Sequence, residues 1–117
     1  MPINRTVLSG NIVDEPVYST TRSGTSVANF VMAVDNRHRT ASGELINDTL
    51  FVRVSTYGGS ADSIEGYLHR GDKVVASGQL RPNHYHDEQG VRRDSIQLVA
   101  EQIEFWNYED ALSVAYV

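Results

Sequence analysis

The sequence contains no cysteine among its 117 residues. The chain therefore forms no disulfide and offers no thiolate for catalysis or metal binding, which suits a reducing compartment. No apolar run approaches the length of a membrane span, and no charged-then-apolar signal pattern opens the chain. We therefore expect a soluble, cytoplasmic protein without a membrane partner.

Lysine is almost absent as well, since Lys73 is the only one among ten basic residues. The others are arginines, whose guanidinium groups bind phosphate in a bidentate way and stack on flat rings. The net charge of −5 argues at first against a polyanionic partner. Four of the fifteen acidic residues, however, lie in residues 101–117, where no basic residue occurs. The rest of the chain is nearly neutral and compatible with nucleic acid.

The chain is long enough for one domain with a single core and too short for two ordinary ones. With 40% hydrophobic and 21% charged residues, its composition is that of a globular protein. We expect one domain over residues 1–106 and a short C-terminal tail over residues 107–117, for which the sequence favours no particular structure.

Five segments have the β-branched and aromatic composition of strands, namely residues 5–13, 26–35, 49–57, 73–86 and 91–106. Gly10 favours a bulge or sharp bend inside the first of them. Residues 15–25 have turn chemistry throughout. The polar residues 36–47 predict a hairpin end that projects beyond the sheet, and residues 87–90, DEQG, predict a tight turn.

One short helix is expected over residues 60–71, between the third and fourth strands. Ser60 is its candidate N-cap and Gly71 its stop, while Ile64, Tyr67 and Leu68 have the spacing i, i+3, i+4. An all-β chain of five strands with a short helix at this place has the layout of a closed Greek-key barrel of the oligonucleotide-binding (OB) type.

Alternation along two of the strands predicts an apolar face and a polar face that carries rings. The polar face of the third strand contains Phe51, Arg53, Ser55 and Tyr57, and that of the fourth contains Val75, Ser77, Gln79, Arg81, Asn83 and Tyr85. Exposed rings stack on unpaired bases while guanidinium groups hold phosphates, which is the chemistry of single-stranded nucleic acid binding. The alternative is that Phe51 and Tyr57 are core residues, because half-buried aromatics are common on any sheet.

Two further interpretations concern metal binding and catalysis. The segment that contains His84, His86, Asp87 and Glu88 offers ligands for Zn²⁺ or Fe²⁺, but no third well-spaced ligand is evident and the acids lie in a turn. The serines that precede glycines lack the strand–turn–helix setting of a nucleophile elbow. We expect no metal, no cofactor and no enzymatic activity; a small metal-dependent enzyme that uses His84, His86 and Asp87 is the alternative.

Four segments stand in a characteristic order and spacing: NRTVLSGNIVDEPVY, SGTSVANFVMAVD, TLFVRVSTYG and SGQLRPNHYHDEQGVRRDSIQLVAEQIEF. Together they resemble the bacterial single-stranded DNA-binding proteins (SSB) over about residues 1–106. The resemblance implies an OB-fold subunit that binds single-stranded DNA without strong sequence preference in replication, recombination or repair, and that assembles as a homotetramer.

The resemblance also implies where bases stack. SSB proteins commonly have tryptophan at the positions of Phe51 and Tyr85 and phenylalanine at that of Tyr57, so this chain keeps a ring at all three. A further tryptophan of the family falls at or next to Arg37, whose guanidinium can also stack. Most members continue into a flexible linker with an acidic tip that recruits other proteins. This chain stops at NYEDALSVAYV, so recruitment through such a tip is not expected.

We therefore predict that Phe51, Tyr57 and Tyr85 stack on bases of single-stranded DNA in the cytoplasm, at the nucleoid. The predicted phosphate contacts are Arg37, Arg39, Arg53, Lys73, Arg81, Arg92 and Arg93. Arg92 and Arg93 are consecutive in a strand and face opposite ways, so only one need touch DNA. An RNA-binding or primosome-type accessory OB module stays an alternative, because stacking with phosphate contacts does not read the sugar.

Overall fold

A computed structural model gives the fold of residues 2–106; Met1 and residues 107–117, the expected tail, lie outside the described residues. The elements in chain order are β1 (Thr6–Ile12), β2 (Val17–Thr20), β3 (Ser26–Arg39), β4 (Leu45–Tyr57), α1 (Gly59–Ile64), β5 (Lys73–His86) and β6 (Arg92–Phe105). Among these residues no helix has the length and apolar character needed to span a membrane.

Five of the strands close into a barrel in the order β1-β5-β6-β4-β3, because β3 pairs back with β1 at Asn11↔Ala33. The pairs are antiparallel except β4 with β6, which run parallel where Val54 lies opposite Leu98. The helix α1 stands between the third and fourth barrel strands in chain order. The prediction of a five-stranded OB-type barrel with one short helix is therefore confirmed.

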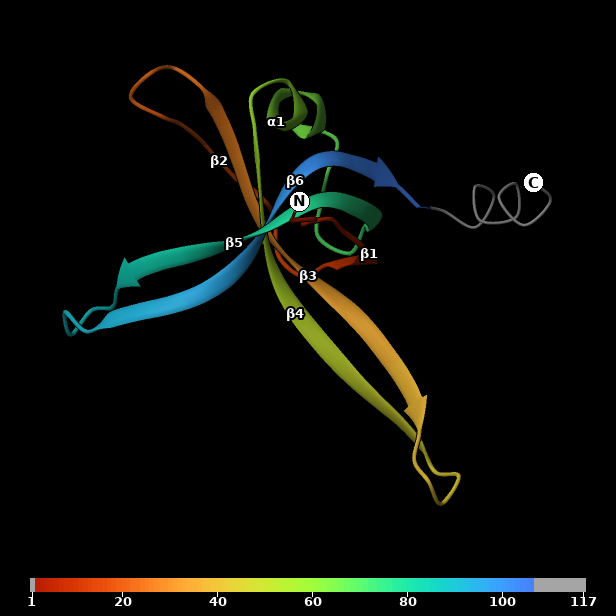
Figure 1. The fold of residues 1–117 in the computed structure, drawn as a ribbon. Coiled ribbons are helices and arrows are strands. Elements are labelled where there is room, and N and C mark those ends of the chain that lie inside the picture. Colours follow the sequence, from red (N-terminus) through yellow and green to blue (C-terminus); the bar gives the residue numbers. More distant parts are fainter. Residues whose placement is uncertain (1, 107–117) are drawn as a thin grey trace.

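The core consists of the side chains that alternate inward from the barrel strands, as a period of two requires. Met32, Val54, Val74 and Leu98 are completely buried in it. The helix α1 covers one end of the barrel, as Figure 1 shows, and it buries Ile64 against the same cluster. Because inward positions belong to the core, the intervening residues of each strand are turned outward and remain available for binding.

Two glycines allow the strands of the barrel to approach closely. A methyl group at Gly10 would collide with the Ala33 carbonyl of β3, and one at Gly78 would collide with the Val99 carbonyl of β6. The bulge that was one expectation at Gly10 is wrong, because β1 pairs with β5 without a register shift through this residue. The register shift occurs instead between β5 and β6, where Gly78 follows Ser77.

Three hairpins extend away from the barrel (Figure 1). Two of them carry predicted site residues: the β3–β4 arm, residues 35–49, and the β5–β6 arm, residues 81–97. Strand pairing reaches Arg39↔Leu45, so most of the predicted polar loop is strand and the prediction of a projecting hairpin is confirmed. The tight turn of the β5–β6 arm is also confirmed, because the Gly90 amide donates to the Asp87 carbonyl at 2.9 Å.

Two local predictions are wrong. Residues 17–20, expected to be turn, form β2 because they complete an antiparallel pair with β3, and the Tyr18 hydroxyl donates to the Ile64 carbonyl at 3.2 Å. The helix ends at Ile64 and Ser60 does not cap it, since the Ser60 hydroxyl donates to the Glu101 carbonyl. Tyr67, which follows the helix, is 71% exposed instead of packed.

Candidate nucleic-acid interface

The strand registers join the outward sides of β4, β6 and β5 into one surface. Ser55 of β4 lies opposite Val99 of β6, and Val99 lies opposite Gln79 of β5. Residues directly opposite in a ladder point to the same side, and every second residue of a strand shares that side. We call this surface the aromatic face and define it by five side chains, Phe51, Arg53, Tyr57, Arg81 and Tyr85.

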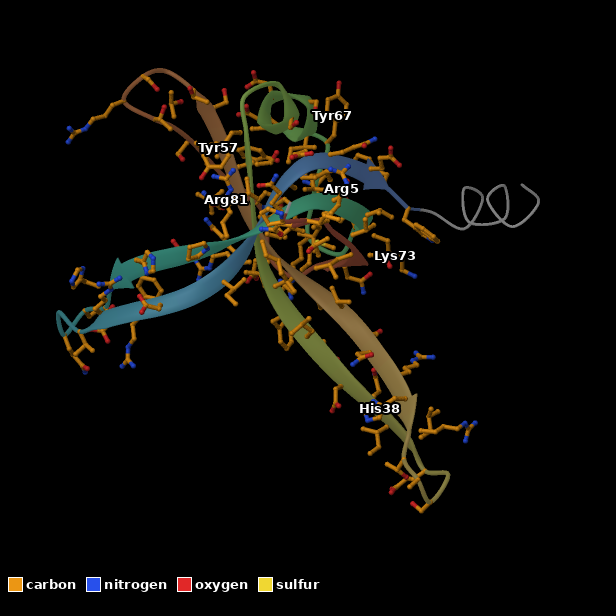
Figure 2. All side chains as sticks on the ribbon, in the orientation of Figure 1. Arg5, His38, Tyr57, Tyr67, Lys73 and Arg81 are labelled. Atoms are coloured by element: carbon orange, nitrogen blue, oxygen red, sulfur yellow. The ribbon has the colours of Figure 1, made fainter. Side chains whose placement is uncertain are left out.

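The three rings of the aromatic face are accessible. Phe51 is 64%, Tyr57 45% and Tyr85 46% exposed. The alternative that Phe51 and Tyr57 belong to the core is therefore wrong, since the core side of β4 is occupied by Val54. Figure 2 shows Tyr57 and Arg81 on the same side of the barrel. Flat rings held by rigid strands are suited to stacking on unpaired bases.

A small polar network lies in the middle of the aromatic face. The Ser55 hydroxyl donates to Asn29 Oδ1 at 2.5 Å and is 3.1 Å from Gln97 Oε1. Ser55 lies on the expected side of β4 but is only 3% exposed, because it is hydrogen-bonded to these two amides instead of open to solvent. The face thus presents the amide groups of Asn29 and Gln97, which can donate to and accept from a base or a sugar.

Most of the predicted arginines also lie on this side of the molecule. Arg37 and Arg39 lie on β3 in the β3–β4 arm, each an even number of residues after Ala33, which pairs with Phe51. Both arginines therefore point to the same side of the ladder as the ring of Phe51. Within residues 2–106, Arg37, Arg39 and the two arginines of the aromatic face form no salt bridge. Their guanidinium charges are therefore uncompensated and available to phosphate.

The two consecutive arginines of β6 are separated by the register. Arg93 lies opposite Tyr85 and shares its side, whereas Arg92 lies opposite His86 on the reverse side. Arg93 Nε donates to Asp87 Oδ2 at 3.0 Å, and the Val91 amide donates to the same carboxylate. Backbone donation from Val91 chiefly, with Arg93 adding to it, holds the pKa of Asp87 below its usual value.

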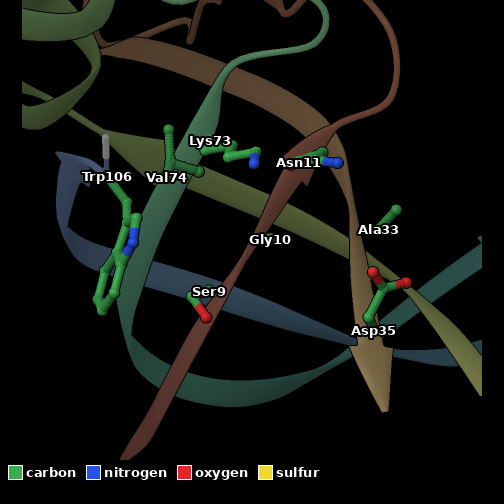
Figure 3. Close-up of a pocket in the computed structure, with 8 residues that line it drawn as sticks. All are labelled: Ser9, Gly10, Asn11, Ala33, Asp35, Lys73, Val74 and Trp106. Carbon is green, nitrogen blue, oxygen red and sulfur yellow. The ribbon is translucent and has the colours of Figure 1, made fainter. Parts of the chain in front are cut away.

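Lys73 stands apart from the other predicted phosphate contacts. In Figure 2 it lies across the barrel from Tyr57, and it lines a hollow of about 260 Å³ at the start of β5. Figure 3 shows this hollow around Gly10, with Trp106 on one side and Asp35 on the other. A phosphate that entered it would meet the Asp35 carboxylate as well as the ammonium group.

The geometry does not favour a metal centre at residues 84–88. His84 Nδ1 lies 2.7 Å from Asp94 Oδ1, while Asp87 accepts from the turn amides and from Arg93. These side chains diverge to the two sides of the β5–β6 arm. Across residues 2–106 there is no cluster of three or more His, Asp or Glu side chains that could hold a metal ion.

Sequence reasoning placed Gln79 and Asn83 on this surface but missed two further amide side chains. Asn29 lies on β3 and Gln97 on β6, and alternation within a strand does not show which residues of another strand lie beside it. The period-two pattern of β3 and β6 is the signal that could have predicted the outward direction of both amides. Two of their neighbours, Asn83 and Ser95, also face each other on this side of the β5–β6 arm.

The chain is similar to known proteins over nearly all of the described residues. Residues 3–106 match the family model described as "Single-strand binding protein family". Single-stranded DNA-binding protein 1 of Staphylococcus aureus (strain COL) is 32% identical over 109 residues, 93% of this chain and 64% of that protein. The single-stranded DNA-binding protein of Paenarthrobacter nicotinovorans is 35% identical over 96 residues, 80% of this chain and 56% of that protein. The chain thus spans less than two thirds of the length of these curated relatives.

Two solved structures share the fold. The Plasmodium falciparum SSB in complex with ssDNA has a TM-score of 0.82 at 24% identity and covers 92% of this chain and 97% of its own. A deletion mutant of the single-stranded DNA binding protein from Thermus aquaticus has a TM-score of 0.81 at 21% identity, over 91% of this chain and 51% of its own. The resemblance to SSB proteins is confirmed. On the family match and the identity to its relatives, the chain belongs to the single-strand binding protein family.

Proposed function

We propose that this protein binds single-stranded DNA with little sequence preference, by stacking bases on Phe51, Tyr57 and Tyr85. The observation that carries the proposal is the aromatic face, where exposed rings and unpaired guanidinium groups share one rigid surface. Every base has a flat face, so stacking does not depend on sequence. The names of the relatives, single-stranded DNA-binding proteins, support the same partner.

Arginines on the aromatic face and on the two arms hold the phosphates. Arg53 and Arg81 lie on the aromatic face, Arg37 and Arg39 extend it along the β3–β4 arm, and Arg93 extends it along the β5–β6 arm. Each phosphate that is neutralised releases counterions, which makes binding weaker as salt rises. Lys73 adds a phosphate contact from its place beyond the aromatic face.

Assembly into a homotetramer is part of the proposal. One edge of β1 pairs with β5 along Thr6–Asn11. The opposite edge of β1 pairs with β3 only at Asn11 and Ile12. The other edge of residues 6–10 therefore has no strand partner within the described chain, and an open edge is a template for pairing with a second copy. Ile3 and Val7 beside this edge are 91% and 63% exposed. Light scattering should give a mass well above 13.0 kDa, and a monomer at micromolar concentration would contradict this part.

The cellular role that fits this chemistry is protection of single strands during DNA replication, recombination or repair, in the cytoplasm at the nucleoid. Because stacking does not read the sugar, the choice of DNA over RNA needs a direct comparison.

A titration of labelled oligo(dT), with fluorescence anisotropy as the readout, tests the proposed function. We expect binding that weakens as salt rises, with the logarithm of the association constant falling linearly against the logarithm of salt concentration. Oligo(U) of the same length is the matched competitor that compares RNA with DNA. Tighter binding of oligo(U) than of oligo(dT) would favour an RNA-binding role, and no binding of either at low salt would reject the proposal.

A further inference from the structure

The polar network in the middle of the aromatic face places two amide side chains against one hydroxyl. We call Asn29, Ser55 and Gln97 the amide network. Ser55 Oγ lies 2.5 Å from Asn29 Oδ1 and 3.1 Å from Gln97 Oε1. A hydroxyl carries a single hydrogen, so it donates to only one of these carbonyl oxygens at a time. The shorter contact gives that hydrogen to Asn29, and the other amide needs a different arrangement.

A half-turn of an amide side chain exchanges its carbonyl oxygen with its NH₂ group. After a half-turn of Gln97, its NH₂ group donates to Ser55 Oγ while the Ser55 hydroxyl donates to Asn29. The opposite arrangement, in which Ser55 donates to Gln97 and accepts from Asn29, satisfies the three groups equally. In either arrangement one amide turns its NH₂ group away from Ser55 and the other turns its carbonyl oxygen away. The amide network therefore presents one donor and one acceptor, in either order.

The outward ends of the two amides are open to a ligand. Within residues 2–106, the side-chain amides of Asn29 and Gln97 have no hydrogen-bond partner besides Ser55. No buried side-chain nitrogen or oxygen of this part of the chain lacks a partner, so the unpaired ends of both amides are reached by solvent. Ser55 itself is only 3% exposed. The hydroxyl thus anchors the amides from below and leaves the contact with a ligand to them.

The amide network lies between stacking rings of the aromatic face. In the sheet, β6 stands between β4 and β5. On β4, Tyr57 follows Ser55 by two residues. On the other side of β6, Tyr85 of β5 pairs with Arg93, which precedes Gln97 by four residues. A single strand that stacks on both Tyr57 and Tyr85 therefore crosses β6 close to Gln97.

Unpaired bases offer an edge that matches the amide network. On their Watson–Crick edges, adenine and cytosine place an amino donor beside a ring-nitrogen acceptor, whereas guanine and thymine place a carbonyl acceptor beside a ring N–H donor. These edges are occupied in a duplex but free in a single strand, where proteins hydrogen-bond them. A donor and an acceptor that can exchange order therefore fit all four bases.

We propose that Asn29 and Gln97 hydrogen-bond the Watson–Crick edge of one unpaired base, and that Ser55 is the positioning residue that holds the two amides in place. The proposal rests on the proposed function, because the same strand stacks on the rings to either side. The contact adds affinity without sequence preference, since either order of donor and acceptor is available. It also rejects a paired base, whose edge has no donor or acceptor to spare.

Thymine methylated at N3 tests the proposal, because it keeps the flat face and the phosphate of the thymine nucleotide but loses the N–H donor of the edge. Oligo(dT) of about ten nucleotides, within the span of one OB fold, is compared with its N3-methyl form by anisotropy titration. The unmodified protein should bind the methylated oligomer about fivefold to tenfold more weakly, as the loss of one or two hydrogen bonds allows. The salt dependence of the two should be the same, because their phosphates are identical.

Apolar variants of the amide network locate the effect. The triple variant Asn29→Leu, Ser55→Ala and Gln97→Met removes all three polar groups together, so none is left buried without a partner. It should bind the two oligomers equally, and Gln97→Met alone should lose most of the discrimination. The matched control is Gln102→Met, a glutamine of the same strand that lies opposite Ser77 beyond the register shift, and it should keep the full discrimination.

The role of Ser55 has its own readout. Ser55→Ala should reduce the discrimination between the two oligomers, because the amides lose their anchor. A purely structural role would instead lower stability in urea and leave the ratio of the two affinities unchanged, which would contradict the positioning role. Circular dichroism checks that each variant is folded.

Equal binding of the two oligomers by the unmodified protein would overturn the inference while leaving the proposed function intact. Discrimination that survives in the triple variant, or that disappears in the Gln102 control, would overturn it as well. The proposed function fails separately, if the unmodified protein does not bind oligo(dT) at all.

Discussion

Tyr85 of β5 and Arg93 of β6 lie directly opposite each other in the β5–β6 arm, on the side that also carries Arg81. A ring and a guanidinium group at opposed positions can hold the base and the phosphate of neighbouring nucleotides. Arg93 also donates to Asp87, whose carboxylate accepts two amides of the turn, so the guanidinium is oriented by the tip of the arm. The arm is therefore an ordered hairpin and not a free loop.

Replacing Tyr85 with alanine should weaken oligo(dT) binding by about 1–3 kcal/mol, because one stacking platform is lost. Tyr57→Ala should have an effect of the same size. The matched control is Tyr67→Ala, which removes an exposed ring that lies after α1 and away from the aromatic face. Anisotropy titrations at constant salt measure the difference. If the Tyr67 variant loses as much affinity as the Tyr85 variant, the placement of the stacking site is wrong.

Substitution of Arg53 with glutamine should reduce the steepness of the salt dependence. One phosphate contact fewer lowers the slope of the logarithmic salt plot by about 0.7 for a single strand. The control is Arg70→Gln, since this residue follows α1 and lies off the aromatic face. An unchanged slope for the Arg53 variant would show that its guanidinium does not contact phosphate.

A methyl group at Gly78 should destabilise the barrel without touching the binding surface. It would collide with the Val99 carbonyl, and overpacking of this kind costs about 1–3 kcal/mol. Gly59→Ala in α1 is the matched control, because nothing lies within 4 Å of the added atom, and it should leave stability unchanged or raise it by up to about 1 kcal/mol. Urea unfolding measures both. Equal stability of the two variants would contradict the close approach of β5 and β6.

The loop between β1 and β2 should make stability depend on acid pH through Glu15. This carboxylate accepts from the Arg70 amide at 3.1 Å and from His69 Nδ1 at 3.2 Å. Donation from Arg70 chiefly lowers the pKa of Glu15 from its ordinary 4.5. A lowered pKa in the folded state contributes stability above about pH 4.5, which is lost as pH falls through the lowered value.

Glu15→Gln should therefore be less stable than the parent at neutral pH and should differ from it less in acid, as the pH falls below 4.5 and through the lowered pKa of the parent carboxylate. Urea unfolding at the two pH values gives both differences. A gap that stays the same size in acid would mean that the charge of Glu15 has no part in holding the loop.

Alternation within each strand was enough to predict which residues of β4 and β5 point outward. Phe51 and Tyr57 lie an even number of residues apart on β4, and Tyr85 lies on β5, whose inward residues are plainly apolar. The exposure of the three rings therefore followed from the local pattern of each strand. The turn at Gly90 was predictable for the same reason, since its positive φ of 76° is a local requirement that glycine meets.

Features that depend on distant partners were not predictable in this way. Ser55 has the local pattern of an exposed residue, yet it is buried because β6 brings Gln97 beside it from 42 positions away in the chain. The strand β2, Val17–Thr20, has strand-forming residues but lies in a segment of turn chemistry, and β3 supplies its hydrogen-bonding partner. For Ser55 the deciding contact is non-local, and no window of sequence contains it. The pairing of β2 with β3 is a local hairpin over residues 17–29, which composition alone did not reveal.

By itself, the sequence determined that this is an all-β chain with one short helix, with rings and arginines on the outward sides of its strands. Period-two alternation and turn chemistry are properties of neighbouring residues, so a single strand is sufficient to express them. Only the tertiary structure decided that these outward sides join into one aromatic face, and that Arg93 lies on the side of Tyr85 while Arg92 lies on the reverse side. Register between strands, set by closure of the barrel and the shift at Gly78, is a relation between distant segments that no single strand contains.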